Sequence, residues 1–91
     1  MLAFLFTDIE GSTRLWEKSP AAMTEALARH DEIMREEIAK HGGRVVKHTG
    51  DGVFAVFPEG GAPLACAVAL QRRVATTDWG GVVLKVRIAI H

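Results

Sequence analysis

The stretch that decides the fold is VKHTGDGVFAVF, residues 46–57. Two β-type runs, Arg44–His48 and Val53–Phe57, lie on either side of the turn Thr49-Gly50-Asp51-Gly52. Runs rich in β-branched and aromatic residues around a Gly-Asp-Gly turn are typical of an antiparallel β-hairpin. The stretch therefore predicts two paired strands, with the carboxylate of Asp51 at the tip of their turn.

A strand and two helices are expected before this hairpin. Leu2 to Thr7 form an unbroken apolar run, which predicts a central strand covered on both faces. Residues 8–13 follow as a turn that opens a short helix, with Ser12 as the expected N-cap. A second, amphipathic helix is expected from Pro20 to a glycine signal at residues 41–43, with the charged face from Glu25 to Glu37 in solvent. The residues on its sheet-facing side recur at helical spacing: Met23, Ala26, Leu27, His30, Ile33, Met34 and Ile38.

One helix and one strand are expected after the hairpin. Leu64–Val74 has helical periodicity, and Val82–Ile90 alternates as a strand with one covered face, with Arg87 pointing outward. The order strand, helix pair, strand, strand, helix, strand is the split βαβ pattern, which predicts an α+β ferredoxin-like sandwich. No linker or repeat interrupts residues 1–91, so we expect one domain. Because the chain stops at His91, directly after a strand, we expect this domain to be incomplete.

The composition limits the class of partner. Eleven basic and eleven acidic residues cancel, which argues against binding of a nucleic-acid polymer. No apolar run reaches the ~20 residues of a membrane span, so no membrane contact is expected from this segment, and a cytoplasmic location is expected. The single cysteine, Cys66, cannot form an internal disulfide, and its apolar neighbours predict a buried thiol.

Two carboxylates are the residues best suited to chemistry. Asp8 follows the first strand and Asp51 lies in the hairpin turn, and in a ferredoxin-like sheet these strands are neighbours. Two carboxylates held close together repel unless a cation lies between them, and Mg²⁺ takes oxygen ligands from carboxylates and phosphates. The pair therefore suggests a metal site for phosphoryl chemistry. The alternative is that Asp51 only forms a turn and Asp8 only precedes a helix.

Residues 11–13 and Lys47 are further candidates. The backbone N–H groups of Gly11-Ser12-Thr13 open a helix and can bind a phosphate, although an ordinary N-cap has the same sequence. Lys47 lies on the strand that leads into the turn. The residues alone leave open whether it is an edge lysine that discourages aggregation or a hydrogen-bond donor to a purine ring. Trp16 and Trp79 are expected to pack, and the four histidines show no metal-ligand spacing.

Two motifs resemble those of a known family. Residues 4–13, FLFTDIEGST, closely resemble the opening motif of class III nucleotidyl cyclase catalytic domains, and residues 46–57 resemble the second motif. Residues 86–91, VRIAIH, are similar to the strand that precedes the second half of these domains. The resemblance covers the whole chain and implies that residues 1–91 are the amino-terminal part of such a domain.

The resemblance implies roles for the candidate residues. Asp8 and Asp51 would bind two Mg²⁺ or Mn²⁺ ions, with the carbonyl of Ile9 as a further ligand. The amides of Gly11-Ser12-Thr13 would hold the nucleotide phosphates. Lys47 matches the position at which relatives that select adenine carry Lys and guanylyl cyclases carry Glu, which favours ATP over GTP.

The implied reaction is attack of the ribose 3′-OH on the α-phosphate of ATP, giving cyclic AMP and pyrophosphate for cyclic nucleotide signalling. The implied enzyme is a homodimer with its sites at the subunit interface. The family's second purine contact, and its Asn and Arg that stabilise the transition state, lie beyond His91. The catalytic residues are therefore unknown, and the isolated chain is expected to turn over little or no ATP.

Two alternatives to this function stay open. One is a truncated, non-catalytic module that binds metal or nucleotide. The other is a palm-type enzyme such as a diguanylate cyclase, whose Gly-Gly-acidic-acidic-Phe hairpin is not matched by residues 49–52.

Overall fold

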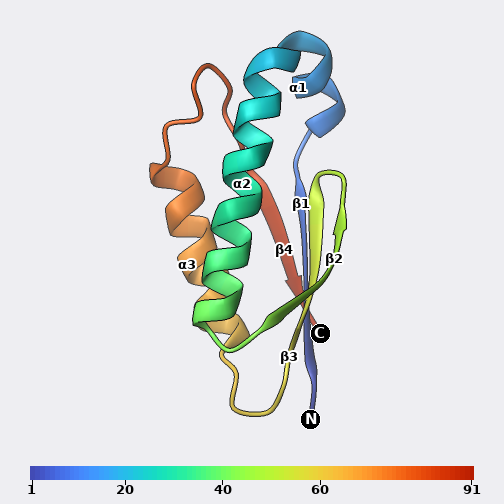
Figure 1. Ribbon diagram of the computed structural model, residues 1–91, viewed down its shortest axis with the longest axis vertical. Helices are drawn as coiled ribbons and strands as arrows, with labels where there is room; N and C mark the ends of the chain where they lie inside the picture. The colour runs from blue at the N-terminus through green and yellow to red at the C-terminus, as the bar shows by residue number, and fades with distance from the viewer.

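The computed structural model describes all 91 residues as a layer of helices on a four-stranded sheet (Figure 1). The sheet is antiparallel throughout, with the strand order β2-β3-β1-β4. α2 and α3 lie along one face of the sheet, and α1 lies at its upper end in Figure 1. This arrangement confirms the ferredoxin-like prediction. The elements are β1 (Ala3–Ile9), α1 (Ser12–Lys18), α2 (Pro20–Lys40), β2 (Arg44–Thr49), β3 (Gly52–Phe57), α3 (Pro63–Thr76) and β4 (Val86–Ile90).

β1 is central in the sheet, but only one of its faces is covered. Leu5, Thr7 and Ile9 are buried, whereas Phe6 on the opposite face is 43% exposed. The prediction of a strand covered on both faces was wrong, because α2 and α3 lie on the same side of the sheet. On the open face the ring of Phe6 stacks on that of Phe54 from β3, with ring centroids 4.6 Å apart. The aromatic rings thus shield one another in place of a second layer.

α2 packs its apolar stripe against the sheet, as predicted. Its inward residues include Ile33 and Met34, both with no exposed surface, and His30 is equally buried. Burial of each such aliphatic side chain stabilises the fold by about 1.5–3 kcal/mol. Glu37 departs from the predicted solvated face, since it is 5% exposed. Its Oε2 accepts a hydrogen bond of 3.0 Å from Nη1 of Arg73, which joins α2 to α3.

α3 buries the single cysteine as predicted. Cys66, Leu70 and Val74 lie in the core. Helical spacing predicts Leu64 on one side of the helix with Leu70 and Val74, but its side chain is exposed. Burial, with a smaller contribution from the charge of Glu37, raises the pKa of the Cys66 thiol to about 11. The thiol is therefore protonated and inert at neutral pH.

The β2–β3 hairpin is held close to β1. Its turn has two residues, Gly50 and Asp51, and Gly50 takes the left-handed conformation (φ 65°) that only glycine adopts without strain. Gly52 allows the close approach, because a Cβ there would lie 2.4 Å from the carbonyl oxygen of Thr7. The Thr7 hydroxyl in turn accepts a hydrogen bond of 3.1 Å from the amide of Val53. These contacts fix the turn beside the end of β1.

β4 is shorter than predicted. It begins at Val86 rather than Val82, because its neighbour β1 ends at Ile9. One further hydrogen bond of 2.8 Å, from the Glu10 amide to the Lys85 carbonyl, extends the ladder. The segment before β4 instead rises from the end of α3 in an open loop and returns into β4, as Figure 1 shows.

Candidate metal and nucleotide site

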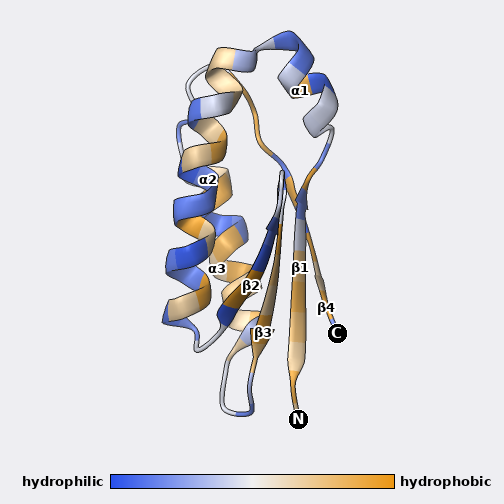
Figure 2. Cartoon of the chain, turned by 45° about the vertical axis from the view of Figure 1, so that its right-hand side comes forward, coloured by the Kyte–Doolittle hydropathy of each residue, from blue (hydrophilic) through white to orange (hydrophobic).

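The two predicted carboxylates lie at the same end of the sheet. Asp8 is the penultimate residue of β1, and Asp51 lies in the β2–β3 turn, directly before β3. Thr7 pairs with Val53, so the turn lies just past the β1–β3 ladder, and both carboxylates are partly exposed. Figure 2 shows that β1 changes from hydrophobic to hydrophilic toward this end. The neighbouring strand ends thus bring together residues that are far apart in the sequence.

The carbonyl of Ile9 lies on the side of β1 that faces this turn. Phe4 and His91 exchange both of their backbone hydrogen bonds across β1 and β4. In an antiparallel ladder, alternate residues of a central strand direct their backbone groups to opposite neighbours. Ile9 follows Phe4 by an odd number of residues, so its backbone groups face the opposite neighbour from those of Phe4. Its carbonyl is therefore directed away from β4, toward β3 and the turn that holds Asp51. Two carboxylates and one carbonyl around one corner are oxygen donors of the kind that hard cations prefer.

A cation from the chain itself is already bound to Asp8. Arg87, its cross-strand partner in β4, donates from Nε to Oδ1 at 2.7 Å and from Nη2 to Oδ2 at 2.9 Å. These hydrogen bonds raise the pKa of Arg87, as do the negative charges of Asp8, Glu10 and Asp51. The guanidinium thus occupies the position on the Asp8 carboxylate at which another cation would bind. The sequence analysis did not predict this pair. It could have been found from the opposite charges that Asp8 and Arg87 place on the outward faces of two adjacent strands.

The candidate phosphate-binding turn opens α1 as predicted, but its cap differs. Gly11 is the N-cap, and Ser12 is the first helical residue. Ser12 was expected at the cap, but the turn requires a left-handed residue, and Gly11 has φ 66°. No side chain caps the helix, so the amides of Ser12 and Thr13 have no side-chain acceptor. These two amides follow Asp8 by only a few residues in the sequence, so they lie near the end of β1.

Lys47 lies on the open face of the sheet. The pairing of β2 with β3 sets it opposite Phe54, after an irregularity in β2 between Val45 and Lys47. Phe54 stacks on Phe4 and Phe6, with ring centroids 5.6 and 4.6 Å away. Lys47 is exposed and forms no hydrogen bond or ion pair with the rest of the chain. The open face thus combines an aromatic platform with a free ammonium group.

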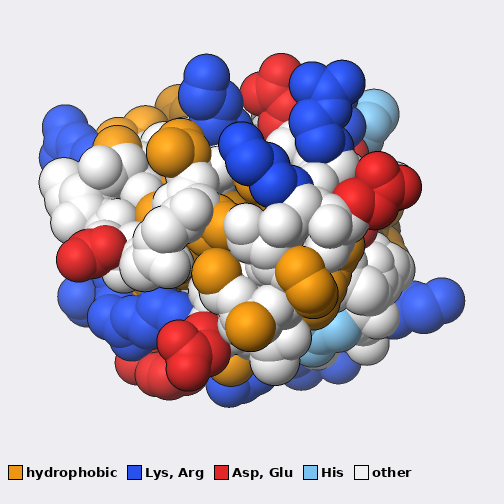
Figure 3. Space-filling view, turned by 90° about the horizontal axis from the view of Figure 1, so that it is seen from above, with side chains coloured by type: hydrophobic (Ala, Val, Ile, Leu, Met, Phe, Trp, Pro, Cys, Tyr) orange, Lys and Arg blue, Asp and Glu red, His pale blue; other side chains and the backbone are white.

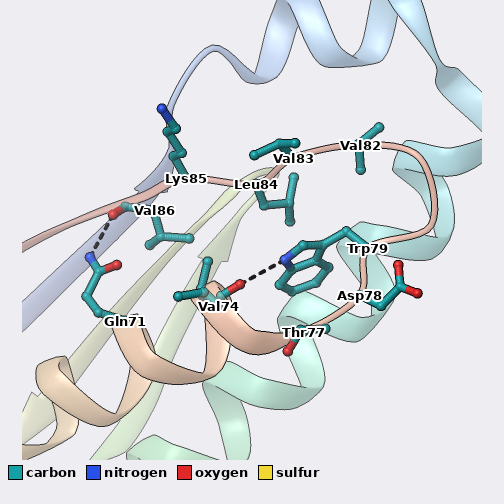
Figure 4. Close-up of a pocket in the computed structure, with 11 residues that line it drawn as sticks. Gln71, Val74, Thr77, Asp78, Trp79, Val82, Val83, Leu84, Lys85 and Val86 are labelled. Carbon is teal, nitrogen blue, oxygen red and sulfur yellow. Dashed lines mark hydrogen bonds between the residues drawn. The ribbon is translucent and has the colours of Figure 1, made fainter.

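The largest cavity lies away from these residues. It has a volume of about 520 Å³ and lies between the end of α3 and the segment that leads into β4. Figure 4 shows Val74, Trp79 and Leu84 pointing into it, and Nε1 of Trp79 donates to the Val74 carbonyl at 3.0 Å. Asp8 and Arg87 line a smaller cavity of about 190 Å³ instead. Trp79 therefore packs, as predicted, and takes no part in the candidate site.

The chain alone does not assemble a complete set of metal-ligating side chains. No group of three or more His, Cys, Asp and Glu side chains comes together to hold a metal ion. On the end that carries α1, acidic and basic side chains alternate around the rim (Figure 3), in keeping with a net charge of zero. None of the helices combines the length and apolar character that a membrane crossing requires. A cation at Asp8 and Asp51 would need to complete its ligand shell with oxygens from outside the chain.

Comparison with known proteins places the chain among nucleotidyl cyclases. The family model for the adenylate and guanylate cyclase catalytic domain matches residues 1–91. An adenylate cyclase of Neurospora crassa is 41% identical over 78 residues, which are 86% of this chain and 3% of that protein. A monomeric adenylate cyclase structure from Trypanosoma brucei matches with a TM-score of 0.93 and 25% identity, over 99% of this chain and 54% of that one.

A guanylate cyclase domain from Catenaria anguillulae in complex with GTP has the same fold, with a TM-score of 0.83 and 20% identity over 98% of this chain and 54% of that one. The chain thus spans about half the length of these structural relatives and a small part of the fungal enzyme. Its sequence motifs, its sheet and the match along its full length agree. The chain belongs to the adenylate and guanylate cyclase catalytic domain family.

Proposed function

We propose that residues 1–91 are the amino-terminal part of an adenylate cyclase catalytic domain, which in its intact parent converts ATP to cyclic AMP and pyrophosphate. The observation that carries this proposal is that Asp8, near the end of β1, and Asp51, in the β2–β3 turn, lie at the same end of the sheet. The identity to an adenylate cyclase of Neurospora crassa supports the same chemistry.

We propose that Asp8, Asp51 and the Ile9 carbonyl hold two Mg²⁺ or Mn²⁺ ions. The bound ions would activate the ribose 3′-hydroxyl and neutralise charge that develops at the α-phosphate. The chain's part is to hold the oxygen ligands rigidly, through the close contact of Gly52 with Thr7. With only two carboxylates, coordination positions remain for the phosphate oxygens of a nucleotide.

The remaining candidates would orient the nucleotide. The uncapped amides of residues 11–13 suit a phosphate, since helix N-termini attract negative charge. The free ammonium of Lys47 can only donate hydrogen bonds. It therefore suits the ring-nitrogen acceptor of adenine better than guanine, which presents an N–H group at the same ring position.

We further propose that the parent works as a homodimer. The open face of the sheet, with Phe6 and Lys47 on it, has no second layer from its own chain. A partner subunit would cover it and supply further groups to the site.

The proposal is tested with the 91-residue chain, ATP and Mn²⁺, by measuring both cyclic AMP and nucleotide binding. We expect ATP binding that requires the metal and is lost in Asp51→Asn, with little cyclic AMP because the family's transition-state groups lie outside these residues. Lys47→Glu should shift binding from ATP toward GTP. ATP binding that is independent of metal, or unaffected by Asp51→Asn, would contradict the proposal.

A further inference from the structure

The Asp8–Arg87 pair is more than a chance contact between surface charges. Because the two residues are direct cross-strand partners, the guanidinium can lie flat against the carboxylate, and each carboxylate oxygen accepts one short hydrogen bond. Bidentate pairs of this kind are stronger and more specific than single contacts. The positive charge therefore lies where a divalent cation bound to Asp8 would lie.

The pair is also able to open. The side chains of Arg87 and Asp8 are 65% and 46% exposed, so water can solvate both when they separate. The negative charges of Glu10 and Asp51 also act on Arg87, although neither carboxylate contacts it. When the guanidinium leaves, the local charge becomes more negative and attracts cations more strongly.

We propose that Arg87 is an intramolecular competitor for the metal: it binds Asp8 in the absence of a divalent cation and must leave before the cation can bind. This inference rests on the proposed metal site at Asp8 and Asp51. Binding of the cation and release of the Arg87 side chain are then one coupled event. The metal converts Arg87 from a structural ion-pair partner into a free cation at the edge of the site.

The test is the affinity of the 91-residue chain for Mn²⁺, measured by titration calorimetry and by the loss of the free-ion electron paramagnetic resonance signal. Arg87→Met keeps the aliphatic stem and removes the competitor, and it should bind Mn²⁺ about fivefold more tightly, the upper range for an exposed ion pair. Arg87→Lys keeps the charge but loses the bidentate geometry, and its affinity should be intermediate. The matched control is Lys85→Met, which removes one charge two residues before Arg87, directly before β4, from a lysine that forms no ion pair.

The outcomes separate this inference from the proposed function. Tighter binding in Arg87→Met than in Lys85→Met supports the competition. If the unaltered chain binds Mn²⁺ and Arg87→Met binds it no more tightly, the competition is wrong and the metal site stands. Equal gains in both variants would also overturn the competition, because they would reflect only net charge. If neither the unaltered chain nor Arg87→Met nor Arg87→Lys binds Mn²⁺ while all retain their circular dichroism spectrum, the metal site itself is wrong.

Discussion

Replacement of Gly52 by alanine is expected to force the hairpin away from β1. The new Cβ would lie 2.4 Å from the Thr7 carbonyl oxygen and 2.8 Å from Oγ1 of Thr49, and contacts under 3.0 Å are essentially never seen. The backbone of Thr7 cannot yield easily, because β1 is paired on both sides. Since Gly52 has no positive φ, the effect is purely steric.

The expected cost follows from two contributions. Overpacking at a rigid contact costs about 1–3 kcal/mol. Loss of the hydrogen bond between the Val53 amide and the Thr7 hydroxyl adds about 1 kcal/mol. The sum of about 2–4 kcal/mol is a large part of the roughly 5–13 kcal/mol expected for a domain of this length, and should lower Tm by about 8–32 °C.

The assay is urea and thermal unfolding followed by far-ultraviolet circular dichroism. The matched control is Gly50→Ala, in the same turn, where an added Cβ meets nothing within 4 Å and only the left-handed φ of 65° is unfavourable. That change should cost about 1–2 kcal/mol. If Gly52→Ala is no more destabilising than Gly50→Ala, the close contact between the hairpin and β1 does not hold the site together, and the reasoning is refuted.

Three further predictions concern the packing that supports the site. Arg73→Met should destabilise the fold by about 1–3 kcal/mol in urea, because it leaves the buried carboxylate of Glu37 unpaired; a neutral result would show that Glu37 finds another partner. Trp79→Phe should lower the free energy of unfolding by about 1–2 kcal/mol, because the Val74 carbonyl loses its hydrogen-bond donor and the cavity loses part of its wall. An unchanged urea midpoint would show that Trp79 does not stabilise the fold in this way. Cys66 should not react with a thiol reagent at pH 8 until the chain unfolds. Because folding raises the pKa of this thiol from 9.0 to about 11, its contribution to stability is full below pH 9 and is lost as the pH rises from 9 to 11. Rapid reaction of the native chain with the reagent would contradict the burial of Cys66.

The hairpin and α2 could be predicted because their signals are local. The Thr49-to-Gly52 turn needs only neighbouring residues, and the stripe along α2 follows from helical spacing alone. The covering of β1 could not be read in this way. Its apolar run is typical of a strand buried on both faces, yet Phe6 is shielded by Phe54 from another strand.

The residues that were missed depend on contacts across the fold. Arg87 is separated from Asp8 by 79 positions, and their pairing needs the register of β1 with β4. Glu37 is buried because α3 brings Arg73 against α2, which helical periodicity within α2 does not reveal. The carboxylates were easier to find, because strand order alone sets the end of β1 beside the β2–β3 turn.

The central claim is that Asp8 and Asp51 hold divalent cations together at one corner of the sheet. The most direct test is paramagnetic broadening in ¹⁵N–¹H spectra of the chain with substoichiometric Mn²⁺ and excess ATP. We expect the amide signals of Ile9 and Gly52 to broaden together, and both effects to disappear in Asp51→Asn and equally in Asp8→Asn. Broadening at only one of the two amides, or broadening that survives at Ile9 in Asp51→Asn, would show that the two carboxylates do not share a metal site.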